Sequence, residues 1–178
     1  ALMDRYGSLS AAMAAPIEDL QRVEGIGENA ALLLKLVPRL CHKARLADAH
    51  RQDLILNTAG RAGAYLMERF IDEKNEVIYQ LCLDQKGKLL ACKRLGEGGI
   101  SSAPLDIRRL VENAILSSAS AVILAHNHPS GFAKASEEDL AATEQARAAL
   151  GTIGVPLSDH IIVADGDFVS LAESGFLF

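Results

Sequence analysis

The residues of this chain with the clearest chemical potential lie between positions 126 and 139. His126 and His128 follow an apolar run, Ala119–Ala125, which predicts a buried strand. Side chains two residues apart on a strand project from the same face. With the carboxylate of Asp139, the two imidazoles would supply three protein ligands to a divalent ion. Three ligands are typical of a catalytic zinc, which keeps its remaining position for water.

Each part of this stretch also has an ordinary structural explanation. Ser136 and Asp139 are spaced as in a capping box at the start of a helix. Asn127, Pro129 and Gly131 are common turn residues. A single histidine at a strand end is often a packed or solvent-facing residue. The metal hypothesis therefore depends on the combination of these residues.

The composition is typical of a soluble globular protein with reduced thiols. The length of 178 residues suits one domain, or one domain with a small appendage. No apolar run approaches the roughly 18 residues of a membrane span, and no secretory leader opens the chain, so we expect a cytoplasmic protein without a membrane partner. The cysteines Cys41, Cys82 and Cys92 are odd in number and form no CxxC pair. This pattern disfavours both a disulfide framework and a thiolate metal site.

The charge balance bears on nucleic-acid binding. The formal net charge is -5, whereas proteins that bind nucleic acids usually carry a basic surplus. Acidic and basic residues also balance over positions 1–50. Strong DNA binding by this chain alone is therefore not expected.

The first part of the chain predicts a small helical module. Pro16 begins one helix, Glu24–Gly27 interrupts it, and Glu28–Leu40 forms a second helix. The polar stretch Lys43–Leu56 predicts a connection. We therefore divide the chain into a helical module (1–45), a linker (46–58) and a main domain (59–178).

Helices and strands alternate in the main domain, which predicts an α/β layered fold. Strands are expected over Glu76–Leu83, Lys88–Leu95, Ala121–Leu124 and Ile161–Val163. Helices are expected over Ala59–Phe70, from Pro104, and from Ser136 to about Leu150. The first two strands should form an antiparallel hairpin, so the sheet should not be purely parallel.

The spacing of the histidines and the serine–aspartate pair resembles the JAMM (MPN+) metalloprotease signature, in which HxHP is followed after seven residues by SxxD. Here Pro129–Ala135 are those seven residues. More narrowly, the string His126–Gly131, the later Leu157–Val163 and the closing Phe168–Gly175 look like the bacterial RadC family. The resemblance covers roughly Ala59–Phe178. It implies an MPN/JAMM-like, cytidine-deaminase-like α/β sandwich behind an N-terminal helix-hairpin-helix module.

The same resemblance implies a zinc-dependent hydrolase of the peptidase or isopeptidase type, acting on a peptide or protein. It assigns the zinc ligands to His126, His128 and Asp139. Ser136 would donate a hydrogen bond to the developing oxyanion. Glu76 matches the upstream glutamate that contacts the attacking water and serves as general base, with Glu97 as the alternative.

Two further features accompany this resemblance. Asp159 and His160 could orient a ligand histidine, or they could form a buried polar pair that stabilises the sheet edge. The segment Phe132–Ala135 departs from the family, which commonly has prolines there. The ligand spacing is retained, but loop shape and substrate choice need not follow the family.

Two alternatives were compared with the metallohydrolase. A zinc deaminase requires a Pro-Cys-x-x-Cys ligand set, and this chain has no CxxC. A DNA-associated binding protein with a structural or vestigial metal site remains the competing function. The segment Val23–Ala30 resembles the turn of a helix-hairpin-helix, in which Gly25 and Gly27 would expose backbone N–H groups to a DNA phosphate. A tight turn between two helices would also require such glycines.

Overall fold

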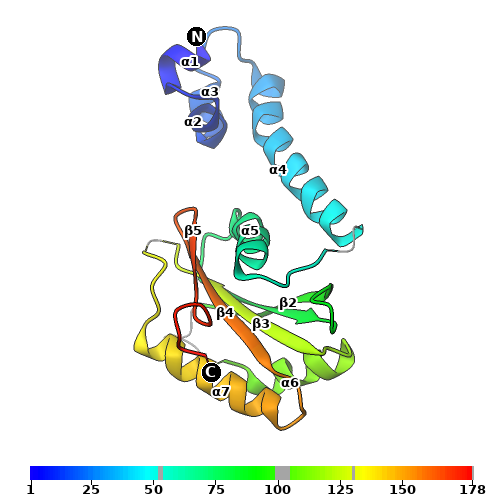
Figure 1. The fold of residues 1–178 in the computed structure, drawn as a ribbon. Helices are drawn as coiled ribbons and strands as arrows, with labels where there is room; N and C mark the ends of the chain where they lie inside the picture. The colour runs from blue at the N-terminus through cyan, green and yellow to red at the C-terminus, as the bar shows by residue number, and fades with distance from the viewer. Residues whose placement is uncertain (52–53, 99–104, 130, 178) are drawn as a thin grey trace. The chain divides into compact units, whose positions relative to one another are not determined.

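The computed structural model describes residues 1–51, 54–98, 105–129 and 131–177, with the backbone alone over 45–51 (Figure 1). The chain divides into two compact units, Ala1–Ala49 and His50–Phe178. Among the described residues, no helix combines the length and the apolar character needed to cross a membrane.

The first unit is helical, as predicted. Its helices are α1 (Leu2–Tyr6), α2 (Leu9–Ala14), α3 (Ile17–Leu20) and α4 (Glu28–Arg51), the last of which runs past the boundary. The Lys35 ammonium group donates hydrogen bonds to the carbonyl oxygens of Met13, Ala14 and Ala15 at 2.7, 3.1 and 2.8 Å. These bonds tie the C-terminal end of α2 to α4.

The turn before α4 differs from the predicted pair of helices. α3 is a single helical turn, and Gly25 adopts a left-handed conformation with φ of 83°. A helix-hairpin-helix module is therefore not established. α4 also continues to Arg51, so the irregular connection predicted over Lys43–Leu56 is wrong up to that residue. Polar residues there lack an obvious apolar face, which concealed the helix from pattern analysis.

The second unit is built on a mixed five-stranded sheet with the order β2-β1-β3-β4-β5. The strands are β1 (Val77–Leu83), β2 (Leu89–Glu97), β3 (Ala121–Asn127), β4 (Leu157–Ala164) and β5 (Asp167–Ser170). β3 and β4 are parallel, and all other neighbours are antiparallel. The predicted hairpin and the mixed sheet are both confirmed.

Helices cover both faces of this sheet (Figure 1). α5 (Ala59–Phe70) packs on one face, and α6 (Ile107–Leu116) and α7 (Glu137–Gly151) lie on the other. Alternate residues of β3 therefore face different helices: Val122 and Leu124 join the core cluster with α6 and α7. β1 is buried along its whole length because it lies inside the sheet between these two layers.

The helix boundaries mostly follow the predictions. α5 covers the predicted range, and α7 begins directly after Ser136. α6 begins at Ile107 with Asp106 as its N-cap, which accepts a hydrogen bond from the N–H of Arg109 at 3.0 Å. Pro104, the predicted start, lies outside the described residues.

The end of the expected linker belongs structurally to the second unit. The N–H of Leu56 donates to the carbonyl of Gly87 at 2.7 Å, and the N–H of Leu89 donates to that of Leu54 at 2.8 Å. Leu56 is fully buried. The apolar residues Leu54, Ile55 and Leu56 thus pair with the hairpin turn before β2.

Gly87 should be the more sensitive of two left-handed glycines. A Cβ at Gly87 (φ 77°) would lie 2.9 Å from the Cβ of Asn57 and 3.2 Å from its Cα, whereas one at Gly154 (φ 71°) would meet no atom within 4 Å. We expect Gly154→Ala to lower the free energy of unfolding by about 1 kcal/mol, and Gly87→Ala by roughly 2–3 kcal/mol. Urea denaturation of both variants measures the difference; equal losses would contradict the packing of Asn57 on the turn.

Candidate metal centre

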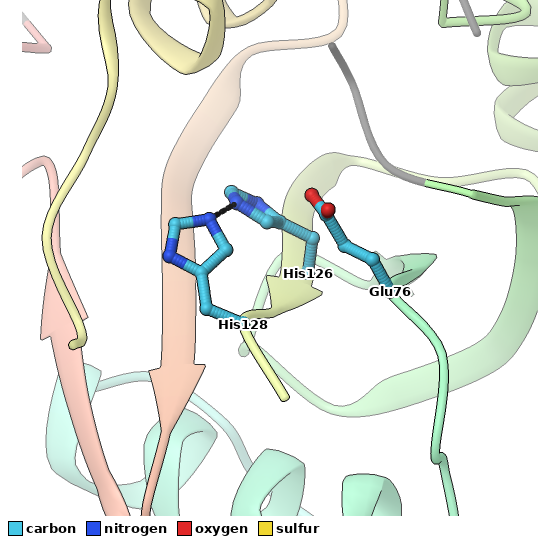
Figure 2. Close-up of side chains that lie close together, drawn as sticks. All are labelled: Glu76, His126 and His128. Atoms are coloured by element: carbon cyan, nitrogen blue, oxygen red, sulfur yellow. Dashed lines mark hydrogen bonds between the residues drawn. The ribbon is translucent and has the colours of Figure 1, made fainter. Parts of the chain in front are cut away.

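The two histidines meet at the C-terminal end of β3. His126 is the second-last residue of β3, and His128 follows directly after the strand. Their Nε2 atoms are 2.9 Å apart, and Figure 2 shows the two rings side by side. His126 is fully buried, while His128 is partly exposed. The prediction that this spacing brings two imidazoles together is confirmed.

The start of α7 brings Asp139 to the same point. One carboxylate oxygen lies 3.1 Å from Nε2 of His126, and the other lies 3.7 Å from Nε2 of His128. Ser136 and Asp139 also form the capping box: Ser136 Oγ accepts from the N–H of Asp139, and Asp139 Oδ2 accepts from the N–H of Ser136. The capping and ligand interpretations of this pair are therefore compatible.

Ser136 is engaged in holding Asp139. Its hydroxyl donates to Asp139 Oδ2 at 2.7 Å while its oxygen accepts the helix N–H. A hydroxyl has a single proton to donate. The oxyanion role predicted for Ser136 would require this proton to leave Asp139.

Glu76 reaches the histidines from the segment that precedes β1 (Figure 2). A carboxylate oxygen of Glu76 and one ring nitrogen each of His126 and His128 all lie within 4.8 Å of one another. Glu97, the alternative, is instead an exposed residue that accepts hydrogen bonds from Asn75 and Arg94. The structure thus brings Glu76, and not Glu97, to the pair.

Asn127 holds the backbone on both sides of Glu76. Its side-chain oxygen accepts a hydrogen bond from the N–H of Val77 at 2.7 Å. Its side-chain nitrogen donates to the carbonyl of Asn75 at 3.1 Å and more weakly to that of Glu73 at 3.5 Å. Asn127 is buried and points to the face opposite His126. The residue between the two histidines therefore positions the segment that carries Glu76.

A chain of hydrogen bonds sets the proton position on His126. The hydroxyl of Thr143 donates to the carbonyl of Asp139, so its oxygen must accept from Nδ1–H of His160, 2.6 Å away. Burial lowers the pKa of His160 well below its usual value, and the nearby His126 acts in the same direction, so this ring is neutral. Nε2 of His160 then accepts from Nδ1–H of His126 at 2.9 Å. This assignment leaves Nε2 of His126 with a lone pair directed at the site.

The second histidine is oriented in the same way. Nδ1 of His128 lies 3.2 Å from the carbonyl oxygen of Phe132, which can only accept a hydrogen bond. Nδ1 therefore donates to this carbonyl, which leaves Nε2 as the ring atom available to a metal ion. Two nitrogen lone pairs and a carboxylate converge within a few ångströms. Such an arrangement needs a cation, either a proton or a metal ion, to offset the mutual repulsion.

Asp139 remains ionised despite its burial. Burial alone would raise the pKa of this carboxyl, but the hydrogen bond and charge of His126, together with the hydrogen bonds from Ser136, hold it well below its usual range. A bound metal ion would supply positive charge beside this carboxylate.

Asp159 and His160 act separately, because neighbouring residues of a strand face opposite sides of the sheet. His160 faces α7 and contacts His126, and its role in orienting a ligand histidine stays a prediction. The carboxylate of Asp159 instead accepts hydrogen bonds from the hydroxyl of Ser170 and the N–H of Ala172. Burial raises the pKa of Asp159 although these bonds oppose the shift. Asp159 thus anchors the segment after β5.

Sequence reasoning missed Thr143 and the role of Asn127. Thr143 lies four residues after Asp139 on α7, so it shares a helix face with that residue. This spacing was the available signal. The sequence around Asn127 indicates only a turn residue, because its partners, Asn75 and Val77, are remote along the chain.

The chain is similar in sequence to known proteins. The model of the RadC-like JAB domain family matches residues 56–176. A UPF0758 protein of Stenotrophomonas maltophilia is 35% identical over 176 residues, which cover 99% of this chain and 75% of that protein. A UPF0758 protein of Legionella pneumophila is 34% identical over 170 residues, or 96% of this chain and 74% of the relative. A UPF0758 protein of Xanthomonas campestris is 35% identical over 176 residues, which cover 99% of this chain and 78% of that protein.

Metal binding should depend on the convergent residues. We expect His126→Ala and Asp139→Asn to weaken zinc binding by more than about 100-fold, because loss of a ligand exceeds the 10–100-fold cost typical of its supporting partners. Asp139→Asn can preserve the cap of α7, so the loss should not reflect unfolding. Elemental analysis and competition with a chromogenic chelator measure zinc content and affinity. Glu97→Gln is the matched control, and undiminished binding in His126→Ala would refute the site.

Thr143 should support the site without touching the ion. Thr143→Val leaves Nδ1–H of His160 without an acceptor in a buried position, so zinc affinity should fall by about 10–100-fold. Thr152→Val is the control, because Thr152 makes the same type of bond to a helix carbonyl, that of Ala149, at the exposed end of α7. Calorimetric zinc titration of both variants gives the comparison. Equal affinities would show that the hydrogen-bond chain does not orient His126.

Proposed function

This chain belongs to the RadC family, and from that premise we propose that its JAB domain is a zinc-dependent hydrolase of the peptidase or isopeptidase type. The convergence of His126 Nε2, His128 Nε2 and the Asp139 carboxylate beside Glu76 carries this proposal. The names of the relatives state no activity, and the chemistry of the site supports the proposal.

The donor set fits zinc. Imidazole nitrogen and carboxylate oxygen are ordinary zinc ligands, and two ligands of a tetrahedral zinc are separated by roughly 3.3 Å when each bond is about 2.0–2.1 Å long. The three distances here, 2.9, 3.1 and 3.7 Å, lie on both sides of that value. Three protein ligands would also leave a position for water, as in catalytic rather than structural sites.

The hydrolytic chemistry would divide between the ion and Glu76. A bound zinc polarises a carbonyl and lowers the pKa of water to roughly 7. In the proposed mechanism, the Glu76 carboxylate accepts a proton from the attacking water and returns it to the leaving amine nitrogen. Because Asn127 bonds to the backbone of both Asn75 and Val77, the direction from which Glu76 approaches is set in advance.

The proposed ligands are largely shielded from solvent. His126 and Asp139 are almost completely buried, and His128 alone of the three retains appreciable exposure. Substrate would therefore approach from the side of His128. In a partly desolvated site, charge interactions are stronger than in water, which favours stabilisation of a developing oxyanion.

The competing function, a DNA-associated protein with a structural metal ion, has weaker support. The glycines proposed to meet a phosphate, Gly25 and Gly27, are followed by Glu28, which opens α4 with a negative charge. That carboxylate would repel a phosphate and interact favourably with the helix N-terminus itself. Charge at this turn therefore supports a connection between helices.

Glu76→Gln should separate binding from catalysis. The amide keeps the size of the side chain but cannot accept the water proton, so we expect zinc content to be unchanged and the hydrolysis rate to fall by about 100-fold or more. The measurement is kcat/KM on substrates selected from a quenched fluorogenic peptide library, with zinc content determined on the same samples.

The control is Glu97→Gln, which should leave both quantities unchanged. Undiminished turnover in Glu76→Gln would assign the base to another residue. Stoichiometric zinc without cleavage of any peptide by the unmodified protein would favour the structural metal site. Iron in place of zinc would preserve the ligand assignment and overturn the choice of zinc.

A further inference from the structure

A cleft lies beside His128. The cleft, of about 390 Å³, opens between the C-terminal end of α5 with its following turn, the residues after β3, and the turn between β4 and β5. Its size falls in the range of sites that bind small ligands. Its position at the carboxyl ends of the parallel strands β3 and β4 is where open α/β sheets commonly bind ligands.

The walls of the cleft are fixed to the candidate metal centre. The N–H of His128 donates to the carbonyl of Val163 at 2.8 Å, which ties the β4–β5 side to the histidine. Asn127 bonds to the carbonyls of Asn75 and Glu73, which ties the α5 side to the same segment. His128 is therefore shared: its Nε2 faces the proposed ion, and the residue lines the cleft.

The interior of the cleft is mainly apolar. Among its lining residues, Phe70 and Val163 are buried, Met67 is half-buried, and Ile71 is 58% exposed. Its charged lining residues are Glu73, which is half-buried and bonds to Arg94 and Tyr79, and the exposed Lys74 and Asp165. Apolar surface left open to water favours an apolar occupant, and methionine adapts its shape to such a group.

We propose that this cleft is the subsite for an aliphatic or aromatic side chain of the amide substrate, next to the bond that is cut. The inference rests on the proposed hydrolase function and names the substrate class for that site. A peptide advances about 3.3–3.6 Å per residue, so a chain whose carbonyl is at the proposed ion carries a neighbouring side chain past the His128 ring. The cleft receives that side chain.

Ile71→Asp tests the subsite, and Ile115→Asp is its matched control. Both isoleucines are 58% exposed, but Ile115 is on α6, remote from the cleft lining. A position-scanning quenched peptide library is cleaved by the zinc-loaded protein and by both variants. We expect at least a 10-fold preference for Leu or Phe over Asp or Lys at one position next to the cut. Ile71→Asp should raise KM for the apolar peptides with little change in kcat, and improve acceptance of Lys.

A binding measurement accompanies the cleavage assay. Calorimetry compares N-acetylleucine hydroxamate with N-acetylglycine hydroxamate, which share the metal-binding group and differ in the side chain. The leucine compound should bind the unmodified protein and Ile115→Asp at least 10-fold more tightly, and this advantage should disappear in Ile71→Asp.

The outcomes separate the two proposals. Cleavage without an apolar preference, together with equal affinity for the two hydroxamates, overturns the subsite and leaves the hydrolase intact. An equal loss in Ile71→Asp and Ile115→Asp also overturns it, because the effect would then be general. Failure of the zinc-loaded protein to cleave any peptide or bind either hydroxamate overturns the proposed function, and the subsite with it.

Discussion

The forced convergence of two imidazole lone pairs is the constraint on which the arrangement of the second unit depends. The carbonyl oxygen of Phe132 and Nε2 of His160 each accept a hydrogen bond from the Nδ1–H of one histidine, so both Nε2 atoms face inward, 2.9 Å from each other. The parallel register of β3 and β4 supplies His160, and the start of α7 supplies Asp139 and Thr143. Without a cation, these elements would hold like partial charges together in a buried space.

The two faces of the sheet carry different parts of the candidate site. Even-numbered residues of β3, ending with His126, face α6 and α7, where the carboxylate and the supporting hydrogen bonds lie. Asn127 faces the opposite side and holds the segments that carry Glu76 and form one wall of the cleft. Three successive residues, 126 to 128, therefore contact the proposed metal site, the segment of the proposed base and the proposed substrate subsite. This is possible because a strand alternates its side chains.

Local patterns predicted the elements and the ligand candidates well, because strand alternation, capping and turn chemistry act over a few residues. The hairpin, α5, α7 and the meeting of His126 with His128 follow from such patterns. The separate roles of Asp159 and His160 depend on β4 lying beside both β3 and β5, a tertiary arrangement. The length of α4 and the pairing of Leu54–Leu56 were missed because neither has a clear period in the sequence.

The anchoring of β4 by the residues after β5 has a consequence for the order in which the site forms during synthesis. Asp159 accepts hydrogen bonds from Ser170 and Ala172, and the N–H of Leu171 donates to the carbonyl of His160 at 3.0 Å. A nascent chain that has not reached Ala172 has already made every proposed ligand, yet it lacks the contacts that secure His160 behind His126. Because synthesis proceeds from the N-terminus, the proposed zinc site matures only after β5 has emerged.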